Sequence, residues 1–170
     1  MMTLLPEYLD FVQKARNGCE IQGFWPINRL KRLLELVQSD EGNIEAELVF
    51  DQQGRQKVIT GHASASLKLT CQRCTQVMDY PLDIEFKLAL ISDESHADRI
   101  PDDCEPFLLT DDRMSLPELL EDEILLAMPL VAMHEHDCSD YLLMQRKQEQ
   151  EEVESAAEKE NPFAALKDLL

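Results

Sequence analysis

Apolar and polar residues alternate through much of the chain between positions 43 and 91, and this alternation constrains the fold more than any other feature. Ile44, Ala46, Leu48 and Phe50 alternate with polar neighbours. A period of two puts every second side chain on the same face of a strand. The pattern returns after turn residues at 51–54. Strands are expected at 43–50, 57–60, 63–71 and 77–91, with a break at Gly61-His62 and a bend or a sheet edge near Pro81.

Helical patterns flank these strands. Helices are expected over residues 7–17, over 26–37 with Pro26 in its first turn, and from Leu116 to Met128 after an N-cap at Ser115. In the last helix Glu121, Asp122 and Glu123 are expected to face solvent. The residues expected on its apolar face are Leu116, Leu119, Leu120, Ile124, Leu125 and Met128. Shorter strands are expected at 19–24 and 106–109. The pattern predicts an α+β fold, an antiparallel sheet or small open barrel flanked by helices.

Two regions of different composition predict the domain organisation. Residues 1–138 are expected to form a single α+β domain, and residues 139–170 a polar C-terminal tail that is disordered or loosely helical. The end of the tail is different again, because Asn161 and Pro162 form a helix start and the apolar residues Phe163 and Leu166 follow. This pattern predicts a short helix that docks into a groove, on this protein or on a partner.

The net charge restricts the partners. The 170 residues carry a formal charge of −18, and such a surface repels phosphates and gains nothing from counterion release on a nucleic acid. DNA and membranes are therefore not expected partners, and a basic protein is. The cluster Arg29, Lys31 and Arg32 is interpreted as a solvated helix face, with RNA contact as the alternative. Residues 92–123 are interpreted as a solvated acidic loop, with cation binding at Asp102-Asp103 or Asp111-Asp112 as the alternative.

The C-x-x-C formed by Cys71 and Cys74 is the main chemical motif. Zinc sites often take two thiolates from one turn and two ligands from a distant segment. Cys71, Cys74, His134 and Cys138 would complete a Cys3His site, with His136 as a substitute for His134. A structural Zn²⁺ is therefore one hypothesis, and reduced thiols without metal or a redox pair are the others.

Catalytic motifs are not found. The sequence has no G-x-S-x-G, no glycine-rich phosphate loop and no H-E-x-x-H. Cys104 with His96 or His62 is the remaining nucleophile pair, and the acidic surroundings of Cys104 disfavour its thiolate. We therefore expect a protein that is not an enzyme. The N-terminus lacks the pattern of a signal peptide, and no apolar run reaches membrane-spanning length, so a cytoplasmic location is expected.

The order of these motifs resembles that of the YceD family, the large ribosomal RNA subunit accumulation proteins of bacteria and plastids. The resemblance rests on Gln22-Gly23 before the Pro-initiated helix, Leu69 to Cys74, Glu121 to Val131, His134 to Cys138, and Asn161-Pro162-Phe163-Ala164. It covers nearly the whole chain. Some members of that family have more cysteines in the second segment, where this chain has His134 and Cys138.

The resemblance implies a non-enzymatic role in the synthesis, processing or stability of 23S ribosomal RNA. Family genes commonly lie beside the gene of a zinc-ribbon protein of the large ribosomal subunit, which implies a small basic partner or a large-subunit assembly intermediate. Direct contact with RNA stays open. The alternative function is a zinc- or thiol-handling protein that serves a zinc-ribbon ribosomal protein.

Overall fold

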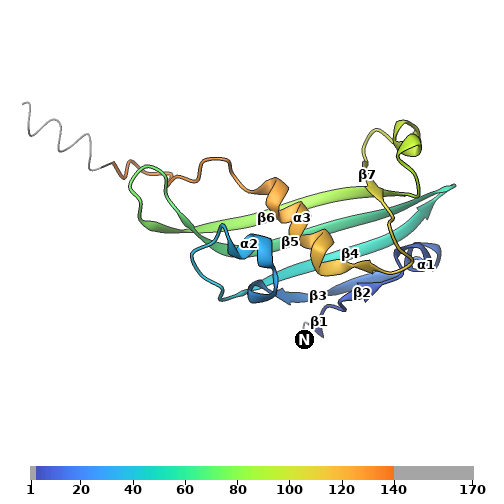
Figure 1. Ribbon diagram of the computed structural model, residues 1–170, viewed down its shortest axis with the longest axis horizontal. Coiled ribbons are helices and arrows are strands. Elements are labelled where there is room, and N and C mark those ends of the chain that lie inside the picture. The colour runs from blue at the N-terminus through green and yellow to red at the C-terminus, as the bar shows by residue number, and fades with distance from the viewer. Residues whose placement is uncertain (1–2, 140–170) are drawn as a thin grey trace, which may run out of the picture.

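A curled six-stranded sheet dominates the structure (Figure 1). The computed structural model describes residues 3–139, and the strands follow the order β1-β3-β4-β5-β6-β7 across the sheet. The central strands are antiparallel, whereas β1 is parallel to β3 and β7 is parallel to β6. Their bounds are β1 Thr3–Leu4, β3 Glu20–Pro26, β4 Asn43–Gln53, β5 Gln56–Thr70, β6 Val77–Ile91 and β7 Glu105–Leu108. A second pair joins β2 (Tyr8–Leu9) to β8 (Met114–Ser115).

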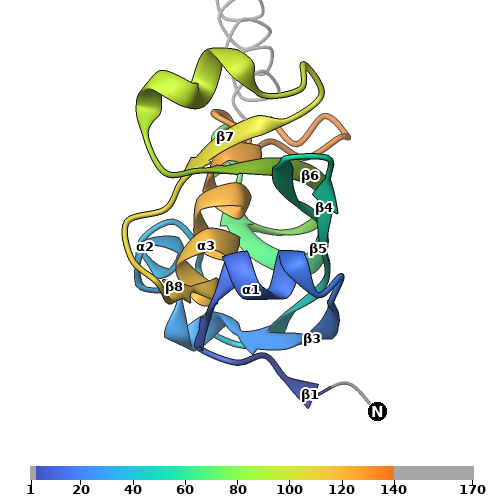
Figure 2. The same ribbon diagram turned by 90° about the vertical axis from the view of Figure 1, so that its right-hand side faces the viewer.

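One face of the sheet is apolar and the other is polar. On β4 the side chains of Ile44, Ala46, Leu48 and Phe50 are buried, and the residues between them are exposed. The sheet curls around α3 (Leu116–Ala127), whose apolar side chains complete the core (Figure 2). The α+β prediction is therefore confirmed. The small open barrel is not confirmed, because β1 and β7 are the outer strands and no pairing among the described residues joins them.

The predicted break at Gly61-His62 is wrong, because β5 runs through it as one long strand. Gly61 pairs with Phe86 on β6, and a Cβ at position 61 would collide with the Phe86 ring. The glycine therefore makes room for an aromatic side chain instead of ending a strand. The prediction for Pro81 is confirmed. Since β7 pairs only with Leu88–Ile91, no described strand pairs with this side of β6 at Pro81.

The prediction of one continuous helix over 26–37 is also wrong. Pro26 is the last residue of β3 and pairs with Asn43, so no helix begins there. A 3₁₀ turn, η1 (Ile27–Arg29), is followed by an extended Leu30 and then by the short α2 (Lys31–Leu34). The main-chain N–H groups of Arg32 and Leu33 donate to Glu121 on α3, so a tertiary contact starts this second helix.

The helix predicted from Leu116 begins at its predicted N-cap Ser115. The helix predicted over 7–17 is wrong in its first turn, because Tyr8–Leu9 pairs as β2 and the helix begins only after Asp10. In α1 (Phe11–Arg16) the Asp10 side chain accepts from the N–H of Gln13, and in α3 the Ser115 hydroxyl accepts from the N–H of Glu118. A 3₁₀ segment, η2 (Glu94–Arg99), leads toward Cys104, which packs with Val58 and Ala89 in a small second cluster. No helix in residues 3–139 is both long and apolar enough to cross a bilayer.

Candidate metal centre

The C-x-x-C forms the turn that joins β5 to β6. Thr70 and Val77 are the last paired residues of the two strands, and the turn runs from Cys71 to Gln76. Inside it the N–H of Cys71 donates to the Gln76 carbonyl at 2.9 Å, and the N–H of Thr75 donates to the Cys71 carbonyl at 2.9 Å. Thr75 has φ of 61°, a left-handed conformation that a β-branched residue rarely adopts. The turn is therefore tight, and it directs both thiols to one side.

The segment after α3 supplies the other half of the site. Met128 ends the helix with an extended backbone, and the chain then runs back past the turn. The N–H of Gln72 donates to the Ala132 carbonyl at 2.8 Å, and the Arg73 guanidinium donates to the His136 carbonyl at 3.2 Å. Hydrogen bonds of the protein itself therefore hold the two halves together.

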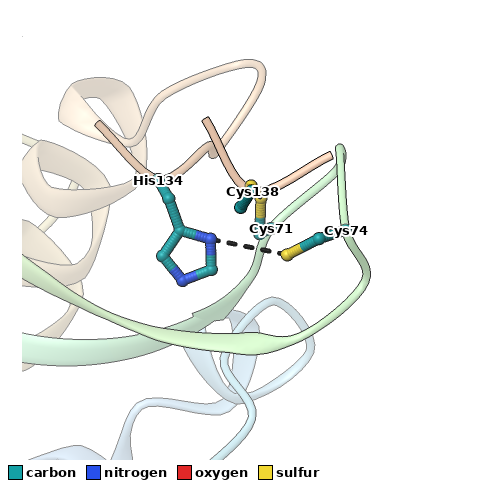
Figure 3. Close-up of side chains that lie close together, drawn as sticks. All are labelled: Cys71, Cys74, His134 and Cys138. Carbon is teal, nitrogen blue, oxygen red and sulfur yellow. Dashed lines mark hydrogen bonds between the residues drawn. The ribbon is translucent and has the colours of Figure 1, made fainter. Parts of the chain in front are cut away.

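Four side chains converge between these halves (Figure 3). The ligand atoms of Cys71, Cys74, His134 and Cys138 all lie within 4.8 Å of one another. The Sγ atoms of Cys71 and Cys138 are 3.6 Å apart, and the Sγ of Cys74 is 3.5 Å from Nδ1 of His134. In a tetrahedral zinc site, bonds of about 2.3 Å to sulfur and 2.0 Å to nitrogen separate the ligand atoms by roughly 3.5–3.8 Å. The arrangement could therefore bind a metal ion.

The thiols have different proton affinities. Burial alone would raise the pKa of Cys71, but main-chain hydrogen bonds at Cys74, His134 and Arg73, with one from the Cys138 thiol, lower it to about 5. The pKa of Cys138 is raised to about 11 by burial and by its hydrogen bonds with Cys74 and Cys71. The site thus favours one thiolate beside a neutral thiol. A bound cation would allow all three sulfurs to ionise, because its charge offsets their repulsion.

Of the two candidate histidines, His134 belongs to the converging group and His136 does not. The two rings lie near each other, with their centroids 4.9 Å apart. The remaining predicted contact residues, Asn161, Pro162, Phe163 and Leu166, lie outside the described residues.

Comparison with known proteins identifies the family. Residues 59–170 match the family described as Large ribosomal RNA subunit accumulation protein YceD. A protein of that name from Haemophilus influenzae is 30% identical over 172 residues, which cover 97% of this chain and 95% of the relative. The chain belongs to the YceD family. The range matched to the YceD family contains all four converging side chains. No solved structure matches the chain.

Other residues singled out in the sequence have simpler surroundings in this YceD-family fold. The only side-chain hydrogen bond described for the Cys104 thiol is to Asp103, and burial with the nearby Asp103 charge raises the pKa of that thiol. Among residues 3–139, no hydrogen bond joins the Cys104 thiol to His62 or His96, and the ring of His62 contacts Asp83 instead. Among residues 3–139, only the Cys71 group brings three or more Cys, His, Asp or Glu ligands together, and Asp103 is instead paired with Lys87.

The basic cluster in the 27–32 region is partly neutralised. Arg32 pairs with Glu121 at 3.1 Å and with Asp122 at 2.6 Å, and the Arg29 guanidinium lies 5.6 Å from the centre of the Trp25 ring. The predicted solvent exposure of Glu121 is wrong, since its side chain is buried. Glu123, also expected to face solvent, is half-buried, and no signal in the sequence marks it. The helical spacing of Glu121 from Pro117 and Ile124 could have marked Glu121 as buried.

Proposed function

We propose that this protein is a non-enzymatic ribosome biogenesis factor that supports the synthesis, processing or stability of 23S ribosomal RNA. The observation that carries the proposal is the match along almost the whole chain to a protein named for large ribosomal RNA subunit accumulation. A match of this extent covers both the sheet and the Cys/His segment, so it is more than a shared motif.

The polar face of the sheet supports a basic protein as the partner. It carries outward-facing carboxylates on three strands, β3, β4 and β6, and its lysines are already paired: Lys68 with Asp79 and Lys87 with Asp103, each at 2.5 Å. The exposed carboxylates on this face include Glu20, Glu45, Glu47, Asp51, Asp79, Asp83 and Glu85. With a net charge of −18, the chain attracts basic proteins and repels RNA phosphates. A basic large-subunit protein, free or in an assembly intermediate, therefore fits better than naked RNA.

The first experiment is depletion of the protein in the cell of origin, followed by measurement of mature 23S against 16S RNA. We expect the ratio to fall and to recover when the wild-type chain is restored from a plasmid. An unchanged ratio during steady growth, recovery from cold and recovery from starvation would refute the proposed role.

We also propose that the four converging side chains hold a structural Zn²⁺. The donor set and the two ligand spacings support zinc, and a bound ion would pin the β5–β6 turn to the segment after α3. Metal analysis of protein purified without chelator tests this. About one zinc per chain is expected, whereas less than about a tenth of an equivalent would favour reduced thiols.

A second candidate function is metal or thiol handling for a zinc-ribbon ribosomal protein. The observation in its favour is the position of the cluster at one end of the sheet, with Cys74, His134 and Cys138 only partly buried. An ion that is handed on should leave within minutes to an apo zinc-ribbon peptide, whereas a structural ion should stay until the chain unfolds. Transfer without unfolding would favour this candidate.

A further inference from the structure

The C-terminal half of α3 lies beside β6 and β7 (Figure 2). Residues of these three elements line a groove there. Two hollows of about 650 and 420 Å³ adjoin there, and both are lined by Glu105, Glu123 and Leu126. The larger one opens where the pairing between β6 and β7 stops at Leu88, which leaves this side of β6 without a described partner strand. We call the two hollows together the α3–β7 groove.

Apolar side chains form much of this groove. Phe86 contributes to one hollow and Phe107 to the other. Between them stands Leu126, which is 76% exposed. Because Leu126 lines both hollows and about three quarters of it is exposed to water, it leaves apolar surface that a partner can cover.

The rim of the groove is acidic, and the two cations described on it, Lys87 and Arg32, are already paired. Lys87 is engaged with Asp103, and Arg32 is engaged with Glu121 and Asp122. Among residues 3–139, no hydrogen bond or ion pair reaches the side chains of Glu105 or Glu123. Glu123 is half-buried, and its pKa is raised to about 7 by burial and then by the charges of Glu105 and Asp122. A cation placed between these carboxylates would therefore relieve an existing repulsion.

We propose that the α3–β7 groove binds a basic segment of a partner protein in which an apolar side chain lies between lysine or arginine residues. The apolar side chain would pack against Leu126, and the cations would approach Glu105 and Glu123. This inference rests on the proposed function, since it assigns a place to the basic partner inferred above.

The acidic charge of the rim favours a basic segment over the other possible occupants of the groove. A second copy of the chain would bring another charge of −18 to an already acidic rim. An RNA backbone or an anionic membrane would be repelled for the same reason. The end of this chain, residues 161–170, has apolar residues but only one lysine, next to Asp168, so it matches the rim less well.

Fluorescence anisotropy of the full chain with a labelled ten-residue peptide of repeated Lys-Leu-Lys tests the groove. The charge variant is Glu105→Gln with Glu123→Gln, and the apolar variant is Leu126→Ser. The matched control is Glu41→Gln with Glu94→Gln, which removes the same charge from exposed positions outside both the groove and the polar face of the sheet. We expect each groove variant to weaken binding about tenfold and the control less than about twofold.

Three results would overturn the inference. Equal weakening by the charge variant and the control would mean non-specific attraction, and an unchanged affinity of Leu126→Ser would mean that the groove is not the site. Displacement of the labelled peptide from the groove by a synthetic peptide of residues 161–170, at lower concentration than by the unlabelled basic peptide, would assign the groove to the chain's own end. Urea unfolding of each variant ensures that only folded chains are compared.

The same variants separate this inference from the proposed function. In cells depleted of the native protein, the control should restore the ratio of 23S to 16S RNA, and the groove variants should not. If the groove variants restore it fully, the ribosomal role stands and the groove inference is overturned. If depletion leaves the ratio unchanged, the proposed function falls, and specific peptide binding still supports the groove.

Discussion

Glu121 joins α3 to α2, and its removal should destabilise the protein more than the loss of any nearby carboxylate. Only 5% of the residue is exposed. Its Oε1 accepts from the main-chain N–H groups of Arg32 at 2.8 Å and Leu33 at 3.0 Å, and its Oε2 accepts from Nε of Arg32 at 3.1 Å. The N-cap residue Leu30 has no side chain that can cap α2. Glu121 therefore caps a helix that cannot cap itself.

The magnitude follows from these three contacts. A hydrogen bond to a charged group contributes about 1.5–3 kcal/mol, and a buried group left without a partner costs about 1–3 kcal/mol. Leu33 is fully buried, so its N–H has no access to water once the carboxylate is gone. Because part of the Arg32 side chain can rehydrate, we expect Glu121→Ala to lower the free energy of unfolding by about 3–4 kcal/mol. A domain of this size has about 5–15 kcal/mol in total.

Urea unfolding at pH 7, followed by circular dichroism, measures this loss. Asp122→Ala is the matched control, because Asp122 pairs with the same arginine while about half of each side chain is exposed. Such a pair contributes about 0–1 kcal/mol. If the two variants lose the same stability within about 0.5 kcal/mol, Glu121 is not a buried cap and the reasoning is refuted.

Three more outcomes are expected. Cys74→Ser and His134→Ala should lose bound zinc in metal analysis while His136→Ala keeps it; zinc loss in all three, or in none, would contradict the four-residue site. Gly61→Ala should lower the free energy of unfolding by about 1–3 kcal/mol, because the new methyl group meets the Phe86 ring. In urea unfolding, adding Phe86→Leu to this variant should recover part of the loss. Additive losses of stability would show that the collision is not the cause. The raised pKa of Glu123, about 7 against an ordinary 4.5, means that the folded state binds the proton more tightly, so wild-type stability should fall as pH rises from 4.5 to 7. Glu123→Gln should remove this fall. At pH 8 the variant should be more stable than the wild type by on the order of 1 kcal/mol after allowance for solvent screening, and this difference should shrink toward pH 5. A stability difference that is the same at both pH values would contradict the raised pKa of Glu123.

Several local features were predicted correctly because they depend on near neighbours in sequence. Ser115 caps its helix as predicted, because its side chain reaches the N–H of Glu118 three residues on. The alternation in β4 gives the buried face of the sheet directly, since side chains in a strand point to opposite faces. Pro81 lies on an unpaired edge because it has no N–H to donate.

The errors occur where a distant residue decides the local conformation. Gly61 looks like a strand break until Phe86, from the next strand, is placed against it. The 26–37 segment has a helical pattern, but pairing of Pro26 with Asn43 and the carboxylate of Glu121 divide it. Glu121 lies four residues after the buried Pro117 and three before the buried Ile124, which is the spacing of one helix face. Because a carboxylate is rarely buried without a partner, the charge of Glu121 led to the prediction that it faces solvent.

The sequence by itself determined that this chain has a sheet with one apolar face and antiparallel central strands, flanking helices, an acidic surface and four residues suited to a tetrahedral metal site. These properties depend on periodicity, composition and residue type, which are readable in one dimension. Only the tertiary structure decided that His134 rather than His136 joins the cysteines, that Glu121 is buried, and that Leu126 stands exposed in an acidic groove. Each of these depends on the path of the chain after α3 or on what packs against α3, and neither is encoded in neighbouring residues.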